Sequence, residues 1–232
     1  MPIPRISIKI WGELACFTRP ETKVERVSYP LMTPSAARNI VDAICWRPEM
    51  RWIVTSIAVL KPIRYISVLR NELQSKISPV TVKKWMVDPS EYTPLAAGAG
   101  PNTEGTQRNS LLLTDVAYVI EAYPVVLNTS GDNTAAKYVA MLERRVKKGQ
   151  CYHRPALGCR EFAADFSSSL QDDIPFPTSL DAGRMLYDVA FSPQGNTAVF
   201  FDAKVTKGVM DTRPEAVLSA RSQEILQCSY KR

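Results

Sequence analysis

The chain has 232 residues, of which 45% are hydrophobic and 22% are charged, and its formal net charge is +6. These values are ordinary for a soluble globular protein with one large domain, or with a main domain and a smaller annex. No apolar run is long enough to span a bilayer and the first residues lack a secretory pattern, so we expect a cytoplasmic protein with no membrane partner.

The first part of the chain predicts a strand followed by a helix. Isoleucines alternate with polar residues over residues 5–10, as in a half-buried strand. Thr33 and Pro34 are typical of an N-cap and a first helical residue, and Pro48 indicates that the helix ends by Arg47. The core face of this helix should carry four residues at helical spacing, Ala37, Ile40, Val41 and Ile44.

Strand-forming residues occur on both sides of a long segment of different character. Residues 52–54 and 57–60 predict strand, closed by Pro62, and residues 111–127 predict another. Between them, residues 70–110 contain four prolines and three glycines and show no clear periodicity. We interpret this segment as an excursion, in the form of a long hairpin with a mobile tip.

The remaining third predicts a second helix and then more strands. Asp132 can cap a helix that runs to about Lys148, with Gly149 as its C-cap. A short terminal helix can open at Pro214. The strand-like segments are residues 160–166, 184–191, 197–204 and 207–211.

This order of elements fits a ferredoxin-like, RRM-like βαββαβ unit, and hence an α+β fold. We predict a ferredoxin-like domain over residues 1–166, interrupted by the hairpin excursion at 70–110. A small antiparallel β-rich region should follow over residues 167–232. Many RNA-binding domains share this scaffold, but the fold alone does not assign a function.

Positive charge is concentrated in the first two thirds of the chain. Residues 1–160 hold 22 Lys or Arg and 13 Asp or Glu, whereas residues 161–232 hold 7 and 10. From Lys137 to Arg160 there are seven basic residues and one acid, Glu143. A helix that only improves solubility usually mixes signs. We therefore expect phosphate contacts here, with a merely solvated basic face as the alternative.

The five cysteines include no C-x-x-C pair, which favours reduced thiols over a disulfide framework. Cys151, His153 and Cys159 supply only three candidate zinc ligands and lack the paired spacing of a zinc knuckle. We therefore predict neither a metal nor a cofactor.

Several longer strings go beyond composition. In chain order they are Cys16-Phe17-Thr18-Arg19-Pro20-Glu21, Lys23-Val24-Glu25-Arg26-Val27-Ser28-Tyr29, Pro34-Ser35-Ala36-Ala37-Arg38, Trp46-Arg47-Pro48, Arg51-Trp52, Leu60-Lys61-Pro62-Ile63, Arg70-Asn71-Glu72, Gly149-Gln150 and Leu157-Gly158-Cys159-Arg160-Glu161-Phe162. Through these strings, residues 5–166 closely resemble the "Cas five" RAMP subunit of type I-C CRISPR systems, also called the Dvulg subtype. The C-terminal third matches it only loosely.

The resemblance implies a ferredoxin-like domain with a β-hairpin thumb and a small C-terminal sheet. It also implies that the protein holds the 5′ handle of the CRISPR RNA (crRNA) at the foot of Cascade, an antiviral RNA-guided complex. There it would touch the backbone subunit and the large subunit, and it would reach target DNA only through the complex. In type I-C systems this subunit also cuts the precursor RNA without a metal and leaves a 2′,3′-cyclic phosphate.

In such a cleavage the 2′-hydroxyl attacks the adjacent phosphate, a base takes its proton, and the leaving 5′ oxygen gains one. A cation beside the phosphorane lowers the barrier. The resemblance places the catalytic positions at Cys45, Lys137 and Tyr138, of which only the lysine matches the commonest pattern. Tyrosine is a poor base at neutral pH, and Cys45 has the alternative interpretation of a small buried side chain. His153, the only histidine, could supply a base or be a loop residue satisfied by a backbone group.

Further basic and aromatic residues are candidates for RNA contact. The arginines near the first helix could cradle phosphates or pair with neighbouring acids. Trp46 could stack on a base, since it lies opposite the apolar stripe of its helix. The predicted RNA-binding residues are Arg19, Lys23, Arg26, Arg38, Trp46, Arg47, Arg70, Arg144, Arg145, Lys148 and Arg160.

Three functions are compatible with the sequence. The first is a crRNA-binding subunit that also processes the precursor. The second is a catalytically silent cap on the 5′ handle, with another factor cutting the RNA. The third is an unrelated RNA-binding module on the same fold.

Overall fold

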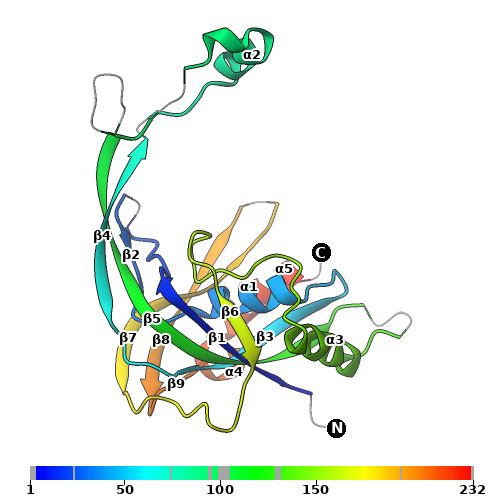
Figure 1. The fold of residues 1–232 in the computed structure, drawn as a ribbon. Coiled ribbons are helices and arrows are strands. Elements are labelled where there is room, and N and C mark those ends of the chain that lie inside the picture. The colour runs from blue at the N-terminus through cyan, green and yellow to red at the C-terminus, as the bar shows by residue number, and fades with distance from the viewer. Residues whose placement is uncertain are drawn as a thin grey trace.

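The structure is a computed structural model. It describes residues 4–22, 24–73, 75–93, 96–98, 105–128, 132–193 and 195–230. Figure 1 shows a body made of a sheet and helices, from which a long hairpin projects.

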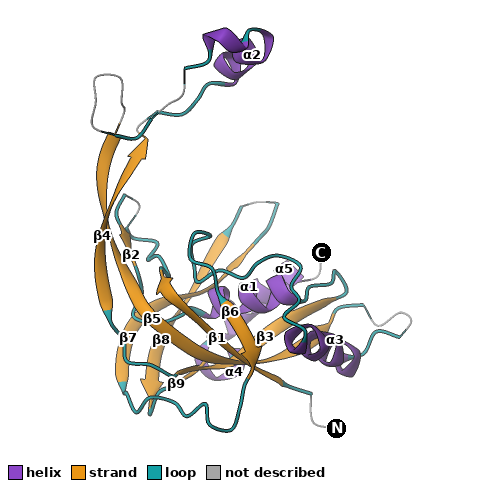
Figure 2. Ribbon diagram, in the orientation of Figure 1, coloured by secondary structure: helices purple, strands orange, loops and turns teal. Residues whose placement is uncertain are grey.

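Four strands form one end of the sheet, namely β1 (Ile6–Ala15), β3 (Met50–Val59), β5 (Gly105–Val126) and β6 (Asp165–Ser168). Their order is β6-β1-β5-β3, and each neighbouring pair is antiparallel. Helices α1 (Pro34–Ile44) and α3 (Ala135–Lys147) make the two crossovers, which is the connectivity of a ferredoxin-like fold. The two helices contact each other as well as the sheet, so they lie on one face of it (Figure 2). The predicted fold class is confirmed.

Both crossover helices begin at side-chain caps. The Thr33 hydroxyl accepts a hydrogen bond from the Ala36 N–H at 3.2 Å and Pro34 opens α1, as predicted. The helix ends at Ile44, before Arg47 as predicted, because Cys45 is already extended. Helix α3 is capped by Thr134 rather than by Asp132. The expected glycine does follow it, since Gly149 has a φ of +61°.

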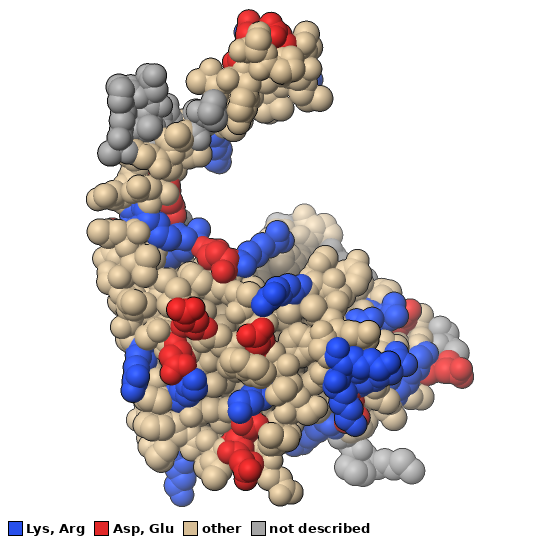
Figure 3. Space-filling view, viewed as in Figure 1, with Lys and Arg blue, Asp and Glu red and all other residues tan. Residues whose placement is uncertain are grey.

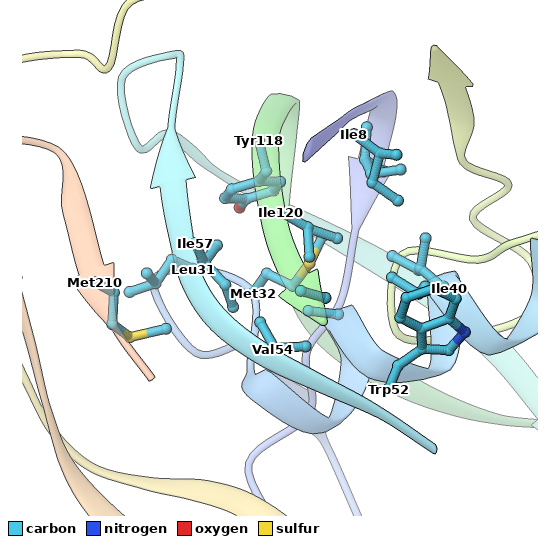
Figure 4. Close-up of a cluster of buried hydrophobic side chains, with 14 of the residues drawn as sticks. Ile8, Leu31, Met32, Ile40, Trp52, Val54, Ile57, Tyr118, Ile120 and Met210 are labelled. Carbon is cyan, nitrogen blue, oxygen red and sulfur yellow. The ribbon is translucent and has the colours of Figure 1, made fainter. Parts of the chain in front are cut away.

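The core lies between the sheet and these two helices. All four residues predicted for the core face of α1 are buried, and Trp52 of β3 is fully buried beside Ile40 (Figure 4). Figure 4 also shows Tyr118 and Ile120 of β5 within the same cluster. Truncating a large aromatic residue such as Trp52 to alanine would cost about 3–5 kcal/mol, so this cluster is a main source of stability.

The predicted excursion is confirmed as a hairpin. Strand β4 (Tyr65–Leu73) pairs antiparallel with the first half of β5, from Tyr65 opposite Leu113 to Leu73 opposite Gly105. The short strand β2 (Arg26–Val27) pairs with β5 on its other edge. Between the hairpin half and the core half of β5, Asp115 adopts a φ of +52° and pairs with Lys61 at 2.5 Å.

The tip of the hairpin carries a helix that we did not predict. Helix α2 (Pro79–Val87) is followed by the 3₁₀ turn η1 (Pro89–Glu91). Ser78 caps α2 through a hydrogen bond from the Val80 N–H, and Trp85 packs edge-on against Tyr92. No residue of α2 is buried, which explains why the apolar pattern gave no helix signal.

The C-terminal strands extend the same sheet. They are β7 (Leu180–Ala190), β8 (Thr197–Thr206) and β9 (Val209–Asp211). Strand β9 pairs with β3, and β7 returns to contact α1. Helices α4 (Pro214–Val217) and α5 (Ala220–Tyr230) follow, of which only the first was predicted. None of the helices in the described segments is long and apolar enough to cross a membrane.

The predicted strand at 160–166 is wrong over its first half. The Leu157 N–H donates to the Phe162 carbonyl at 2.7 Å, which closes residues 157–162 into a turn. Strand β6 begins only at Asp165. Gly158 has a φ of +88°, and a Cβ there would lie 1.9 Å from the Cys16 carbonyl oxygen. The turn therefore depends on a glycine.

Candidate nucleic-acid interface

The C-terminal end of α1 is held by side chains from two other elements. Arg145 of α3 donates from Nη1 to the Ile44 carbonyl at 2.6 Å, and Trp52 of β3 donates from Nε1 to the Cys45 carbonyl at 2.7 Å. Both carbonyls would otherwise lack a partner at the helix end. The structure thus gives Arg145, a predicted RNA contact, a packing role between the two helices.

The first turn of α3 presents a lysine and a tyrosine side by side. The Thr134 hydroxyl accepts from the Lys137 N–H at 3.2 Å. The Asn133 Oδ1 atom accepts from Tyr138 Oη at 2.9 Å and from Lys137 Nζ at 3.4 Å. Asn133 therefore holds the ammonium and the phenol together, although sequence reasoning did not identify it.

The end of α1 and the start of α3 act on each other electrostatically. Burial raises the pKa of Tyr138, Glu49 and Cys45 raise it further, and Arg47 opposes them. These influences place residues 45–49 beside the first turn of α3. The structure thus brings the three predicted catalytic positions together, and their individual roles in catalysis stay predictions.

Cys45 is buried, which argues against a role in proton transfer. Its side chain is only 1% exposed. Burial raises its pKa even though Arg145, Arg47 and Arg144 favour the thiolate, so the thiol stays protonated at neutral pH. Cys45 is therefore the small buried residue that the sequence offered as an alternative.

An exposed basic face surrounds Lys137 and Tyr138. Arg47, Arg144 and Lys148 are all exposed, and none forms an ion pair with any residue in the described ranges. Trp46 is 52% exposed, as expected from its position opposite the apolar stripe. Figure 3 shows Lys and Arg side chains gathered over α3. A surface of this kind suits phosphate groups and unstacked bases.

At the foot of the hairpin the arginines are neutralised. Arg26 and Arg70 both donate to Glu161 Oε1, at 2.6 and 2.7 Å, and Arg70 also pairs with Glu72 at 2.8 Å. Although partial burial opposes it, hydrogen bonds and Arg26 lower the pKa of Glu161. Figure 3 shows blue and red side chains in contact here. A phosphate would have to compete with these carboxylates.

Arg38, a predicted RNA contact, is bound by carboxylates in the folded chain, and its role in RNA binding stays a prediction. Its Nε and Nη2 atoms donate to Asp188 of β7 at 3.1 and 3.0 Å, and its Nη1 donates to Asp42 at 2.8 Å. Arg51 donates to the same Asp188 at 2.7 Å. The guanidinium of Arg38 thus pairs with two carboxylates. Pairing with acids was the alternative that the sequence offered for this arginine.

Two other predicted contacts lie in loops outside α1 and α3. The guanidinium of Arg19 stacks over the Tyr29 ring, 4.7 Å from its centroid. Arg160 is exposed in the turn before β6. Lys23 lies outside the described residues.

His153 belongs to a loop that is bound to the end of α1. The N–H groups of Tyr152 and His153 donate to the Ala43 carbonyl at 2.9 and 3.0 Å. The exposed imidazole ring packs edge-on against Tyr152, with 4.4 Å between centroids. Among the side chains that the structure describes, no three His, Cys, Asp or Glu residues are grouped so that they could hold a metal ion.

Comparison with known families agrees with this architecture. Residues 6–208 match the family model described as CRISPR-associated protein (Cas_Cas5). The chain belongs to the Cas5d family. A curated Cas5d relative from Mannheimia succiniciproducens is 46% identical over 222 residues, which cover 90% of this chain and 95% of the relative. One from Thermus thermophilus is 43% identical over 187 residues, covering 81% and 74%. Both relatives are named CRISPR pre-crRNA endoribonuclease Cas5d.

Two solved structures share the fold of this Cas5d chain. A CRISPR-associated protein superposes with a TM-score of 0.61 at 24% identity, covering 91% of this chain and 94% of the other. The protein SMU1763c from Streptococcus mutans, described as functionally uncharacterized, gives 0.62 at 20% identity, covering 92% and 94%. The whole described body, including the C-terminal strands, thus belongs to a known architecture.

Proposed function

We propose that this Cas5d protein binds crRNA and cuts its precursor as an endoribonuclease. The observation that carries the proposal is the Asn133-bridged pair of Lys137 and Tyr138, which opens a basic face free of ion pairs among the described residues. The names of two relatives, at 43% and 46% identity, support the same activity.

The chemistry follows from the site. The 2′-hydroxyl attacks the neighbouring phosphate, and the exposed Lys137 ammonium stabilises the charge that builds on the phosphorane. The raised pKa of Tyr138 keeps its phenol protonated at neutral pH, so it is not the base. Its buried ring orients Lys137 through Asn133, and the Lys137 ammonium donates a proton to the leaving 5′ oxygen. His153, in a loop bound to the end of α1, is the candidate for the proton acceptor. No step in this scheme needs a metal or a cofactor.

The binding role requires more surface than the catalytic pair. We assign the 5′ handle to the face formed by Trp46, Arg47, Arg144 and Lys148, where phosphate contacts position the RNA and stacking holds a base. We assign the projecting hairpin and the C-terminal strands to contacts with the backbone and large subunits of Cascade. Target DNA is then reached only through the complex, in the cytoplasm.

The test is cleavage of the cognate repeat RNA by the purified protein in EDTA. Wild type should give one cut with a 2′,3′-cyclic phosphate, and Lys137→Ala should lower the single-turnover rate by about 100-fold, as expected when a transition-state charge loses its counter-charge. Lys204→Ala, which changes an exposed residue of β8, is the matched control and should retain the wild-type rate. Equal rates for both variants would refute the role of Lys137.

The silent cap on the 5′ handle is a second candidate, because Cys45 and the Tyr138 ring are both buried. It predicts tight binding of the repeat with no cut at any RNA concentration, and Lys137→Ala would then weaken binding alone. If the purified protein did not bind the repeat RNA at all, both proposals would be refuted.

A further inference from the structure

Two cysteines that are distant in sequence meet beside the foot of the hairpin. Cys16 directly follows β1, and Cys159 lies in the turn before β6. The Cys16 N–H donates to the Leu157 carbonyl at 3.0 Å, and Cys159 Sγ lies 3.7 Å from the Cys16 carbonyl oxygen. Gly158 permits this close approach of the two backbones.

The surroundings of Cys159 favour a thiolate. Arg26 of β2 donates from Nη1 to its sulfur at 3.5 Å, and the Thr18 hydroxyl lies 3.8 Å away. A hydrogen bond with Cys16, helped by Thr18 and Arg26, lowers the pKa of Cys159 to about 6 against the effects of burial and of Glu161. The same hydrogen bond and burial raise the pKa of Cys16. One thiolate and one thiol therefore share the site.

Small molecules can reach Cys159, whereas Cys16 is buried behind it. Cys16 and Cys159 line an open cavity of about 240 Å³, together with Thr18, Ser35 and Asn39. Cys159 is itself partly exposed, whereas Cys45 is buried. Cys151 and Cys228 are exposed, but neither has an arginine hydrogen-bonded to its sulfur within the described part of the chain.

We propose that Cys159 is a reactive thiolate which a hydroperoxide oxidises, and that Cys16 then closes a disulfide with it. This modification site is separate from the RNA-cleavage chemistry. It joins the end of β1 to the turn whose Glu161 binds Arg26 and Arg70.

The two steps balance. The Cys159 thiolate attacks one peroxide oxygen, so that an S–O bond forms, the O–O bond breaks, and the sulfur loses two electrons to the peroxide, which leaves as hydroxide or alkoxide. The Cys16 thiol then attacks the sulfenic sulfur. An S–S bond forms, the S–O bond breaks, and the leaving hydroxide takes the Cys16 proton to become water.

The first test needs no variant. The folded full-length protein is alkylated with iodoacetamide between pH 5 and 9, and each cysteine is quantified by peptide mass spectrometry. The Cys159 rate should level off above about pH 6, and at pH 6.5 it should exceed the Cys151 rate about fivefold, since the gain in thiolate fraction outweighs the loss of nucleophilicity. Arg26→Gln should move the inflection to higher pH, because it removes the nearest cation. A Cys159 rate that instead rises through pH 8–9 in wild type would overturn the proposal.

The second test follows the product. Limited hydrogen peroxide should yield a Cys16–Cys159 cross-linked peptide that dithiothreitol reverses, and a higher melting temperature, because a cross-link over so long a loop restricts the unfolded chain. In Cys16→Ser, dimedone should trap the sulfenic acid on Cys159 and no disulfide should form. Cys151→Ser is the matched control and should behave as wild type. Cross-links between other cysteines, with none at this pair, would contradict the inference whether or not the protein cuts RNA.

Discussion

Asn133 is the residue on which the geometry of the candidate catalytic site depends. Its single side-chain oxygen accepts from both Lys137 and Tyr138, so it limits the freedom of the two groups before any RNA arrives. Preorganised groups spend less free energy on ordering during the reaction. The amide is neutral, which leaves the positive charge of the lysine available to a phosphate.

Asn133→Ala should therefore lower the rate of precursor cleavage more than it lowers RNA affinity. We expect about a tenfold fall in the single-turnover rate, equivalent to one well-placed hydrogen bond, and less than a twofold change in the dissociation constant. Cleavage and binding of the same repeat RNA measure the two quantities. Asn39→Ala changes an exposed asparagine of α1 and should change neither. An affinity loss as large as the rate loss would mean that Asn133 contacts RNA directly.

At the scale of single elements, α3 divides its arginines between two tasks. Arg145 is partly buried and bonds to the end of α1, whereas its neighbour Arg144 is exposed and has no ion pair within the described ranges. Adjacent residues of one helix point in different directions, so one serves packing and the other faces solvent.

This division predicts opposite outcomes for two similar variants. Arg145→Ala should lower the free energy of unfolding by about 1–2 kcal/mol, because it strips the Ile44 carbonyl of a charged donor. Arg144→Ala should change it by less than about 0.5 kcal/mol but weaken RNA binding and reduce its salt dependence by about one counterion. Urea denaturation and salt titration of RNA binding separate the two effects. If both variants lost only stability, the assignment of Arg144 to RNA would fail.

Some of these elements were predictable from the sequence and others were not. Apolar periodicity predicted α1, α3 and the strands β1, β3 and β5, since each buries one clear face. Strand β6, which has no buried residue, was placed too early in the chain. The same signals missed α2, which has the Ser78-Pro79 start of a helix but buries nothing. The exposure of Trp46 was predicted from the apolar stripe of the preceding helix. Lys137 was identified through the family resemblance, and the roles of both residues at the site stay predictions. Asp188 was missed because its partners Arg38 and Arg51 are distant in the chain and are set by tertiary contacts. Asn133 was missed although its partners are local, because the capping pattern pointed to Asp132 instead.

On the scale of the whole molecule, one buried carboxylate ties the C-terminal strands to the ferredoxin-like part. Asp188 of β7 pairs with Arg38 of α1 and Arg51 of β3, and only 6% of its side chain is exposed. Removing one partner of a buried ion pair leaves the opposite charge without compensation.

Asp188→Ala should therefore destabilise the protein by about 3–5 kcal/mol, as judged by urea unfolding followed by tryptophan fluorescence. Asp202→Ala removes an exposed carboxylate from β8 and should change stability by less than about 0.5 kcal/mol. A similarly small effect at Asp188 would mean that the C-terminal strands are held by apolar packing alone.

Stability should also fall in acid. Arg213 lowers the pKa of Asp211. Although partial burial opposes it, the backbone N–H of Leu170 and the side chain of Lys9 lower the pKa of Asp173. A carboxyl group with a lowered folded pKa contributes stability above its unfolded pKa of about 4 and loses it as the pH falls further. Burial raises the pKa of Asp42, so the contribution of this carboxyl group to stability increases as the pH falls. It is one group against the two above. We expect the melting temperature to drop between pH 5 and pH 3.

Asp173→Asn supplies the control for this acid effect. It removes the titrating group while it keeps an oxygen that can accept from the Leu170 N–H. The variant should show a shallower fall in melting temperature over the same pH range. An unchanged slope would assign the acid sensitivity to other carboxylates.

The 22-residue strand β5 has a mechanical consequence. It is one continuous backbone from the hairpin to the centre of the sheet, and its direction changes where Asp115 takes a positive φ. The hairpin therefore joins the sheet through a bend at one residue, Asp115, whose side chain pairs with Lys61. Because β5 runs from the hairpin into the sheet that carries α1 and α3, we expect a force on the hairpin to reach that sheet through this one strand.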